Sequence, residues 1–116
     1  MNETSKLAAY RTFKTNLMAV AAQIGAKAVR KPREGEGVFR VEALDDENVN
    51  IEITYTNYES NGGPALYIGP SLRQRELTNL TPANLKKHLI AHLSASRKMR
   101  AEIALDEAKD DYSAKA

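Results

Sequence analysis

The sequence predicts a two-layer α+β domain, in which an N-terminal helix and a long C-terminal helix cover one face of an antiparallel sheet. Three observations lead to this fold class. Apolar residues recur every three or four positions near both ends of the chain, they alternate with polar residues in the middle, and glycine- and proline-rich turns separate the alternating segments. The expected order is helix, three strands, helix (α-β-β-β-α), with three to four strands in the sheet.

The first helix is predicted from about residue 4 to residue 24. Gly25 follows its last periodic apolar residue, and a glycine in the left-handed conformation commonly ends a helix. Continuing the helix to Arg30 would cost about 1 kcal/mol for an interior glycine. We therefore expect the helix to end near Gly25, with residues 26–31 as a short edge strand or an extended linker. The apolar face is made of Tyr10, Phe13, Leu17, Val20 and Ile24.

Two segments with a period of two predict a β-hairpin. Phe39, Val41 and Ala43 alternate with polar residues in the first segment, and the second alternates in the same way from Val49 to Tyr55. The polar residues 45–48 between them have the length of a hairpin connection. Each strand has one apolar face, so we expect one packed and one solvated face of the sheet, with Tyr55 in the core.

A third strand is predicted at residues 65–68, between two turns. The first turn is the glycine-rich stretch 61–64, and the second is Gly69-Pro70. Residues 71–79 are ambiguous, because their alternation fits a further strand as well as an irregular loop.

The second helix has a clear start. Thr81 is a candidate N-cap, Pro82 suits the first helical position, and Leu80 and Leu85 stand where a hydrophobic staple would place them. The buried stripe continues through Leu89 and Leu93, and it weakens after residue 94. The core is thus expected at about residues 4–95, and residues 106–116 are expected to form an exposed extension that frays into a disordered tail. A weakened stripe suits a homodimer seam as well as a solvated end.

Length and composition are those of one ordinary globular domain spanning residues 1–116. The chain has 42% hydrophobic and 28% charged residues and no cysteine. Disulfides and thiolate metal sites are therefore excluded, and the composition fits a reducing compartment. No apolar run approaches the ~20 residues of a membrane span. We expect a cytoplasmic protein that has no membrane partner.

The charge is distributed unevenly, although the net charge is only +2. Residues 1–30 carry +4, residues 37–60 carry −5, residues 61–100 carry +6 and the last sixteen carry −3. Lys86 and Arg97 are eleven residues apart on the second helix, so they share one side of it, and Lys87 and Lys98 repeat that relation. These cations predict a surface for an anionic partner, either nucleic acid or an acidic protein. The predicted surface comprises Arg73, Arg75, Lys86, Lys87, Arg97, Lys98 and Arg100.

Candidate catalytic and metal sites have ordinary structural explanations. His88 and His92 have a metal-ligand spacing, but no third ligand is indicated. The acidic stretch 45–47 lacks the alternation of a calcium loop and suits a turn. We therefore expect no cofactor, no metal and no catalytic residue. Tyr58 and Tyr67 are candidate surface aromatics, since exposed rings on a sheet can stack on bases.

Three functional hypotheses follow. The first is a non-enzymatic binding or regulatory protein that uses basic helix surfaces against nucleic acid or an acidic protein. The second is a protein–protein adaptor or inhibitor that acts through the acidic hairpin or the extended second helix. The third, ranked last, is an enzyme whose site is assembled from scattered polar residues.

Overall fold

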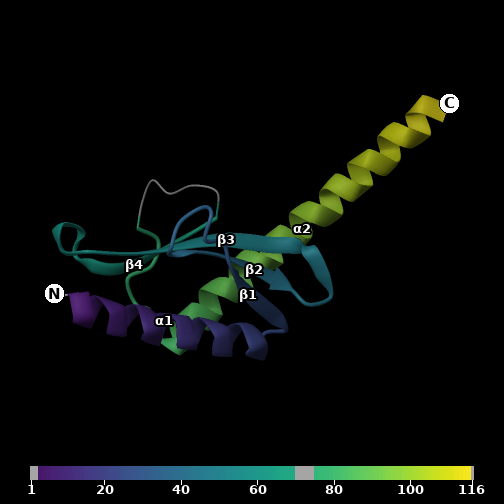
Figure 1. Ribbon diagram of the computed structural model, residues 1–116. Coiled ribbons are helices and arrows are strands. Elements are labelled where there is room, and N and C mark those ends of the chain that lie inside the picture. Colours follow the sequence, from purple (N-terminus) through teal and green to yellow (C-terminus); the bar gives the residue numbers. More distant parts are fainter. Residues whose placement is uncertain (1–2, 70–74, 116) are drawn as a thin grey trace.

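The computed structural model describes the backbone of residues 3–69 and 75–115, and the side chains of these ranges through residue 108. It contains four strands in one antiparallel sheet of order β1-β2-β3-β4, with both helices on the same side of that sheet (Figure 1). The predicted α+β class is confirmed. In chain order the elements are α1 (Glu3–Gln23), β1 (Ala26–Arg30), β2 (Val38–Ala43), β3 (Asp46–Tyr58), the short 3-10 turn η1 (Glu59–Asn61), β4 (Gly63–Ile68) and α2 (Pro82–Lys115).

The first helix ends where the sequence predicts. Gly25 has a φ of 72°, in the left-handed region, and its carbonyl accepts a hydrogen bond from the Leu44 amide at 2.9 Å. A residue with a Cβ would be strained there. The chain then pairs with β2 over its next five residues, from Ala26 opposite Ala43 to Arg30 opposite Phe39. Residues 26–30 are thus an edge strand, not a linker.

The strand register collects the apolar side chains on one face of the sheet. Phe39 lies opposite Ile53 in the β2–β3 pair, and Ile53 lies opposite Ile68 in the β3–β4 pair. Because side chains alternate along a strand, the neighbours at two-residue steps share this face, including Tyr55, which is buried as predicted. The opposite face is mostly polar.

Both helices cover the apolar face. Phe13, Leu17 and Val20 of α1 are buried against it, and so are the predicted leucines of α2: Leu85, Leu89 and Leu93. At one end of this core the Phe13 ring stacks on the Tyr55 ring, with 4.7 Å between the ring centroids. Packing of an amphipathic face, more than intrinsic propensity, stabilises helices of this kind.

Part of the ambiguous stretch 71–79 runs beside β4. Leu77 and Leu66 exchange two backbone hydrogen bonds, of 2.8 and 3.1 Å, and Leu77 joins the core. This is a single isolated bridge, so residues 75–79 are irregular apart from it. Residues 70–74 lie outside the described ranges.

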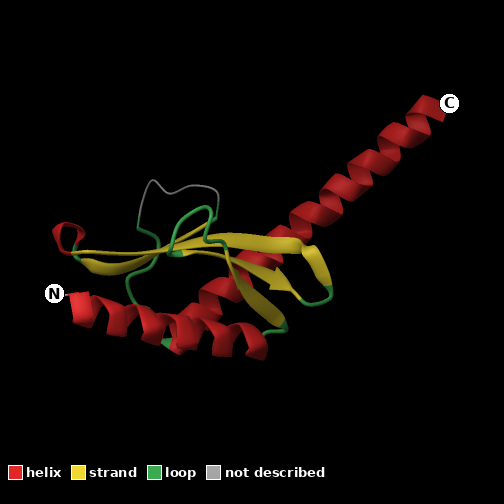
Figure 2. Cartoon of the chain, in the orientation of Figure 1, coloured by secondary structure: helices red, strands yellow, loops and turns green. Residues whose placement is uncertain are grey.

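The second helix continues far beyond the core. Its last contacts with the sheet include a hydrogen bond from Ser96 Oγ to the Asn50 carbonyl, at 3.1 Å. Residues 97–108 are all exposed, and the helix projects from the body as a straight rod (Figures 1 and 2). The helix reaches Lys115, in agreement with the predicted long C-terminal helix, whereas the exposure and fraying of residues 106–116 as a whole stay predictions. Within the described ranges, no helix combines the length and apolar character needed to cross a membrane.

Candidate polyanion-binding surface

The two helices carry positive charge without acidic residues between the cations. Residues 4–33 and 77–101 contain no aspartate and no glutamate. Because α1 packs against α2, both basic segments lie in one layer of the molecule. We call this surface the basic layer, and its members are Lys6, Arg11, Lys14, Lys86, Lys87, Arg97, Lys98 and Arg100.

Most cations of the basic layer are available to a partner. Lys86, Lys87, Lys98 and Arg100 are exposed, as is Arg11 of α1. Over the parts of the chain that the structure describes, Arg97 is the single member of the layer within ion-pair distance of a carboxylate. The other seven make no ion pair among the described residues, so they can attract an anion.

Arg97 forms an ion pair within the molecule. Its guanidinium donates two hydrogen bonds to the Asp45 carboxylate, of 3.1 and 3.0 Å. The hydrogen bond and charge of Arg97 lower the pKa of Asp45, and Asp45 in turn raises the pKa of Arg97. This bidentate pair joins α2 to the β2–β3 turn. Arg97 consequently adds less to the basic layer than the sequence suggests.

Arg75 is also engaged in the fold. Its side chain is half-buried, and Nη2 donates to the carbonyls of Gly63 and Pro64, at 3.2 and 3.1 Å. The side chain thus holds the turn that enters β4, and it lies outside the basic layer. Arg73, the remaining predicted anion-binding residue, lies outside the described residues.

The two predicted surface aromatics lie differently relative to the basic layer. Tyr58 is exposed at the end of β3, and it lines the same hollow as Lys6. Tyr67 pairs with Thr54 on the sheet face that the helices leave open, and its hydroxyl accepts a hydrogen bond from Asn61 Nδ2 at 3.3 Å. The sheet therefore separates Tyr67, but not Tyr58, from the basic layer.

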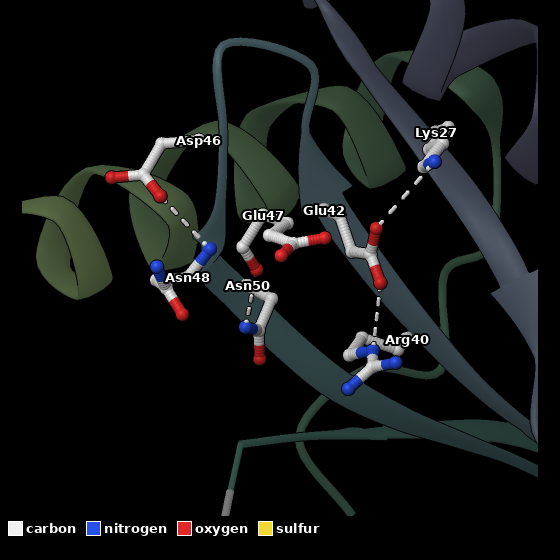
Figure 3. A network of polar contacts seen from close by, with 7 residues as sticks. All are labelled: Lys27, Arg40, Glu42, Asp46, Glu47, Asn48 and Asn50. Carbon is white, nitrogen blue, oxygen red and sulfur yellow. Dashed lines mark hydrogen bonds and ion pairs between the residues drawn. The ribbon is translucent and has the colours of Figure 1, made fainter.

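The open sheet face and the β2–β3 turn carry the acidic residues in a bonded network (Figure 3). Glu42 is buried, and its carboxylate lies 2.9 Å from Arg40 Nε and 3.7 Å from Lys27 Nζ. In the turn, Asp46 Oδ1 accepts the Asn48 amide at 2.9 Å. Such an Asx turn is the ordinary role of an aspartate at this position. The network thus stabilises the sheet and turn.

One histidine and two larger hollows bring further polar side chains together among the described residues. His92 faces Glu76 across 3.7 Å, and its neighbour Ser96 donates to a backbone carbonyl. Both line a hollow of about 570 Å³ between α2 and the sheet. A second hollow, of about 580 Å³, lies between the start of α1 and the end of β3. Among the described residues, no group of three histidine, aspartate or glutamate side chains could hold a metal ion.

The sequence reasoning did not include Lys6, Arg11 and Lys14 of α1 among the candidate residues. The acid-free stretch 4–33 was the signal that could have found them. Comparison of the chain with protein-family models, with curated proteins and with solved structures found no match. The charge geometry of the basic layer is therefore the feature from which a function can be proposed.

Proposed function

We propose that this chain is a non-enzymatic binding protein whose basic layer contacts a polyanion, with nucleic acid as the first candidate. The observation that carries the proposal is a pair of acid-free helical segments in one layer, residues 4–23 of α1 and 82–101 of α2, with seven cations that have no carboxylate partner among the described residues. Release of counterions from phosphates would supply the binding free energy.

The spacing of the cations favours a polymer of negative charges. From Lys86 to Arg100 the helix rises about 21 Å, at 1.5 Å per residue. A nucleic acid carries regularly spaced phosphates over such a length, whereas an acidic protein would need carboxylates placed opposite each of these cations. On the open sheet face, Arg40 and Lys27 are already paired with the buried Glu42 carboxylate, so these two cations are engaged within the fold. The basic layer is thus the face that a nucleic acid would approach.

Charge reversal on the basic layer tests this proposal. We expect Lys86→Glu/Lys87→Glu to weaken binding of a labelled 20-nucleotide DNA or RNA at least tenfold, by fluorescence anisotropy at low salt. The slope of log K against log salt should become shallower by about 2 for duplex DNA, because two phosphate contacts are lost. The matched control is Arg30→Glu/Arg33→Glu, which changes the net charge equally on exposed residues outside the basic layer.

The binding results distinguish nucleic acid from an acidic protein as the partner. No binding of single- or double-stranded nucleic acid at low salt would exclude nucleic acid and leave an acidic protein as the partner. Equal losses in the two double variants would show that net charge, and not the basic layer, governs binding. The cysteine-free composition is compatible with the cytoplasm, where we place this function.

An adaptor function is the second candidate, favoured by the projecting part of α2. Of the two surfaces considered for it, the acidic turn is already engaged through Asp45 and Asp46, whereas the helix extension is exposed. Truncation after Ser94 should then abolish recovery of a protein partner in a pull-down. Recovery of the same partner by the truncated chain would exclude the extension as the contact. An enzymatic role stays a lower-ranked prediction.

A further inference from the structure

A hollow of about 580 Å³ lies between the start of α1, the β1–β2 connection and the end of β3. Figure 1 shows the first turns of α1 and the end of β3 on the same side of the molecule. The ladder between β2 and β3 stops where the Tyr55 amide donates to the Gly37 carbonyl, at 2.8 Å. Residues 56–58 extend beyond it and, among the described strands, pair with β4 alone. The hollow therefore opens at a free margin of the sheet.

Aromatic and apolar side chains contribute to the walls of this hollow. The Tyr10 and Tyr55 rings are 5.7 Å apart between centroids, and the Tyr10 hydroxyl donates to the Glu36 carbonyl at 3.3 Å. Tyr58 and Leu7 line the hollow too, yet they are 61% and 47% exposed. The volume lies in the range of small-molecule sites, ~300–1,000 Å³. The hollow thus presents a tyrosine ring that the described fold leaves uncovered, beside rings that the fold holds in place.

Charged side chains of both signs line the hollow. Two cations and three carboxylates contribute to it: Lys6, Arg30, Glu3, Glu34 and Glu36. A phosphate inside the hollow would therefore meet more negative than positive charge. A nucleobase is uncharged and carries hydrogen-bond donors and acceptors, which side chains of either sign can meet. The lining is consequently suited to a base, and less so to a phosphate.

We infer that the hollow holds one unpaired base of a single-stranded nucleic acid, with the base stacked on the Tyr58 ring and the adjoining phosphate on Lys6. Lys6 belongs both to the lining of the hollow and to the basic layer. A strand that follows the basic layer therefore reaches the hollow at the start of α1. This inference rests on the proposed function and narrows its partner to single strands.

The requirement for an unpaired base follows from the position of Tyr58 in the hollow. A base within a duplex is stacked and paired, and its extrusion costs free energy, whereas a base in a single strand is free to turn outward. Proteins that bind single strands commonly combine cations along the backbone with aromatic rings under the bases. Tyr58 and Lys6 supply one of each at the same hollow.

Substitution of Tyr58 tests the stacking, by fluorescence anisotropy with a labelled 20-nucleotide single strand at low salt. We expect Tyr58→Ala to raise the dissociation constant at least fivefold. Tyr58→Phe should stay within twofold of the wild type, because stacking needs the ring and not the hydroxyl. The matched control is Tyr67→Ala, which removes a tyrosine from the open sheet face. Equal weakening by Tyr58→Ala and Tyr67→Ala would overturn the inference.

A strand of abasic sites tests the contact with a base, because it keeps the phosphates and lacks the rings. The wild type should bind this strand at least fivefold more weakly than the normal strand of equal length. Tyr58→Ala should bind the two strands alike, since the ring and the base contribute through one contact. An equal affinity of the wild type for both strands would contradict the base in the hollow. Displacement of the strand by millimolar nucleoside monophosphates would indicate a mononucleotide site instead and overturn the assignment to single strands.

The salt dependence separates the phosphate contact from the stacking. Lys6→Gln should make the slope of log K against log salt shallower by about 0.7 for a single strand, whereas Tyr58→Ala should leave the slope unchanged. An unchanged slope in Lys6→Gln would contradict the phosphate contact. Because Arg30 lines the hollow, duplex DNA is the suitable probe for the Arg30→Glu/Arg33→Glu control described above.

The Lys86→Glu/Lys87→Glu variant distinguishes failure of this inference from failure of the proposed function. If this variant binds single strands weakly while Tyr58→Ala binds them as the wild type does, the hollow holds no base and the basic layer remains the binding surface. If the wild type binds neither single strands nor duplexes at low salt, both proposals are wrong.

Discussion

Arg75 and two glycines, Gly62 and Gly37, show how single residues set the local geometry near the turns. Arg75 donates to the carbonyls of Gly63 and Pro64, and a Cβ on Gly62 would stand 2.7 Å from Arg75 Nη1. The arginine therefore holds the turn into β4, and Gly62, with a φ of 85°, supplies its left-handed backbone. On the other side of β3, the Gly37 carbonyl accepts the Tyr55 amide at 2.8 Å. Here the backbone of the β1–β2 connection lies directly against β3.

The Gly37 contact predicts a large effect of a single methyl group. A Cβ at this position would lie 2.3 Å from the Tyr55 carbonyl oxygen, so the backbone must shift. We expect Gly37→Ala to lower the free energy of unfolding by about 2–3 kcal/mol in urea titrations. The control is Gly25→Ala, where the space is open and left-handed strain costs about 1 kcal/mol. Equal losses in both variants would contradict this explanation.

At the scale of elements, α2 serves two purposes in one continuous helix. Its first half buries Leu85, Leu89 and Leu93 against the sheet, and its second half, residues 97–115, projects from the body as an arm. The β1–β2 connection is likewise more than a linker. Its Glu34 side chain interacts with Glu52 on the open face of β3. Two carboxyl groups are thus brought together where one element crosses another.

This carboxyl pair predicts a pH dependence of stability. Desolvation raises the pKa of Glu52 above 4.5, Glu34 raises it further, and Lys31 and Arg40 oppose the shift. A raised pKa contributes stability below pH 4.5, and that contribution is lost as the pH rises through the folded-state value. Glu52→Gln mimics the protonated form, so it should raise stability at pH 7, within the roughly 0.2–1 kcal/mol typical of exposed charge pairs. The difference should vanish near pH 4.

Thermal or urea unfolding at pH 4, 5.5 and 7 provides this comparison. Glu47→Gln is the control, because it removes one negative charge from the neighbouring turn without touching the Glu34–Glu52 pair. A Glu52→Gln variant that is less stable than the wild type at pH 7 would show that the Glu52 carboxylate is stabilised by Lys31 and Arg40 instead.

At the scale of the whole molecule, the arm determines the shape. The Cα radius of gyration is 16.9 Å and the longest dimension is 65 Å. A compact chain of 116 residues would have a radius of gyration of about 13.4 Å. The charge is also arranged on this scale, because the basic layer lies on the helices and the acidic β2–β3 turn reaches α2 through the Asp45–Arg97 pair.

Small-angle X-ray scattering checks the projection of the arm. We expect a radius of gyration of about 17 Å for the full chain, extrapolated to zero concentration. The chain truncated after Arg100 should give about 13 Å, the value of a compact 100-residue domain. A full-length value near 13 Å would mean that the arm folds back onto the body.

Local patterns predicted most of the fold. The end of α1 at Gly25, the alternation of β2 and β3, and the start of α2 at Pro82 all depend on residues within a few positions of one another. The edge strand at 26–30 could not be separated from a linker, because its pairing partner lies in β2, farther along the chain. Part of the basic layer was likewise predicted from charge on α2, whereas the α1 cations joined it through helix packing.

The sequence by itself determined the class of fold, the apolar face of each element and the segregation of charge along the chain. Only the tertiary structure decided which cations are available. Arg97 meets Asp45 across 52 positions, and Arg75 meets the turn at Gly63 and Pro64. The reason is physical: hydrophobic periodicity and turn propensity act between near neighbours, whereas ion pairs and hydrogen bonds between side chains depend on distances that exist only after the elements have packed.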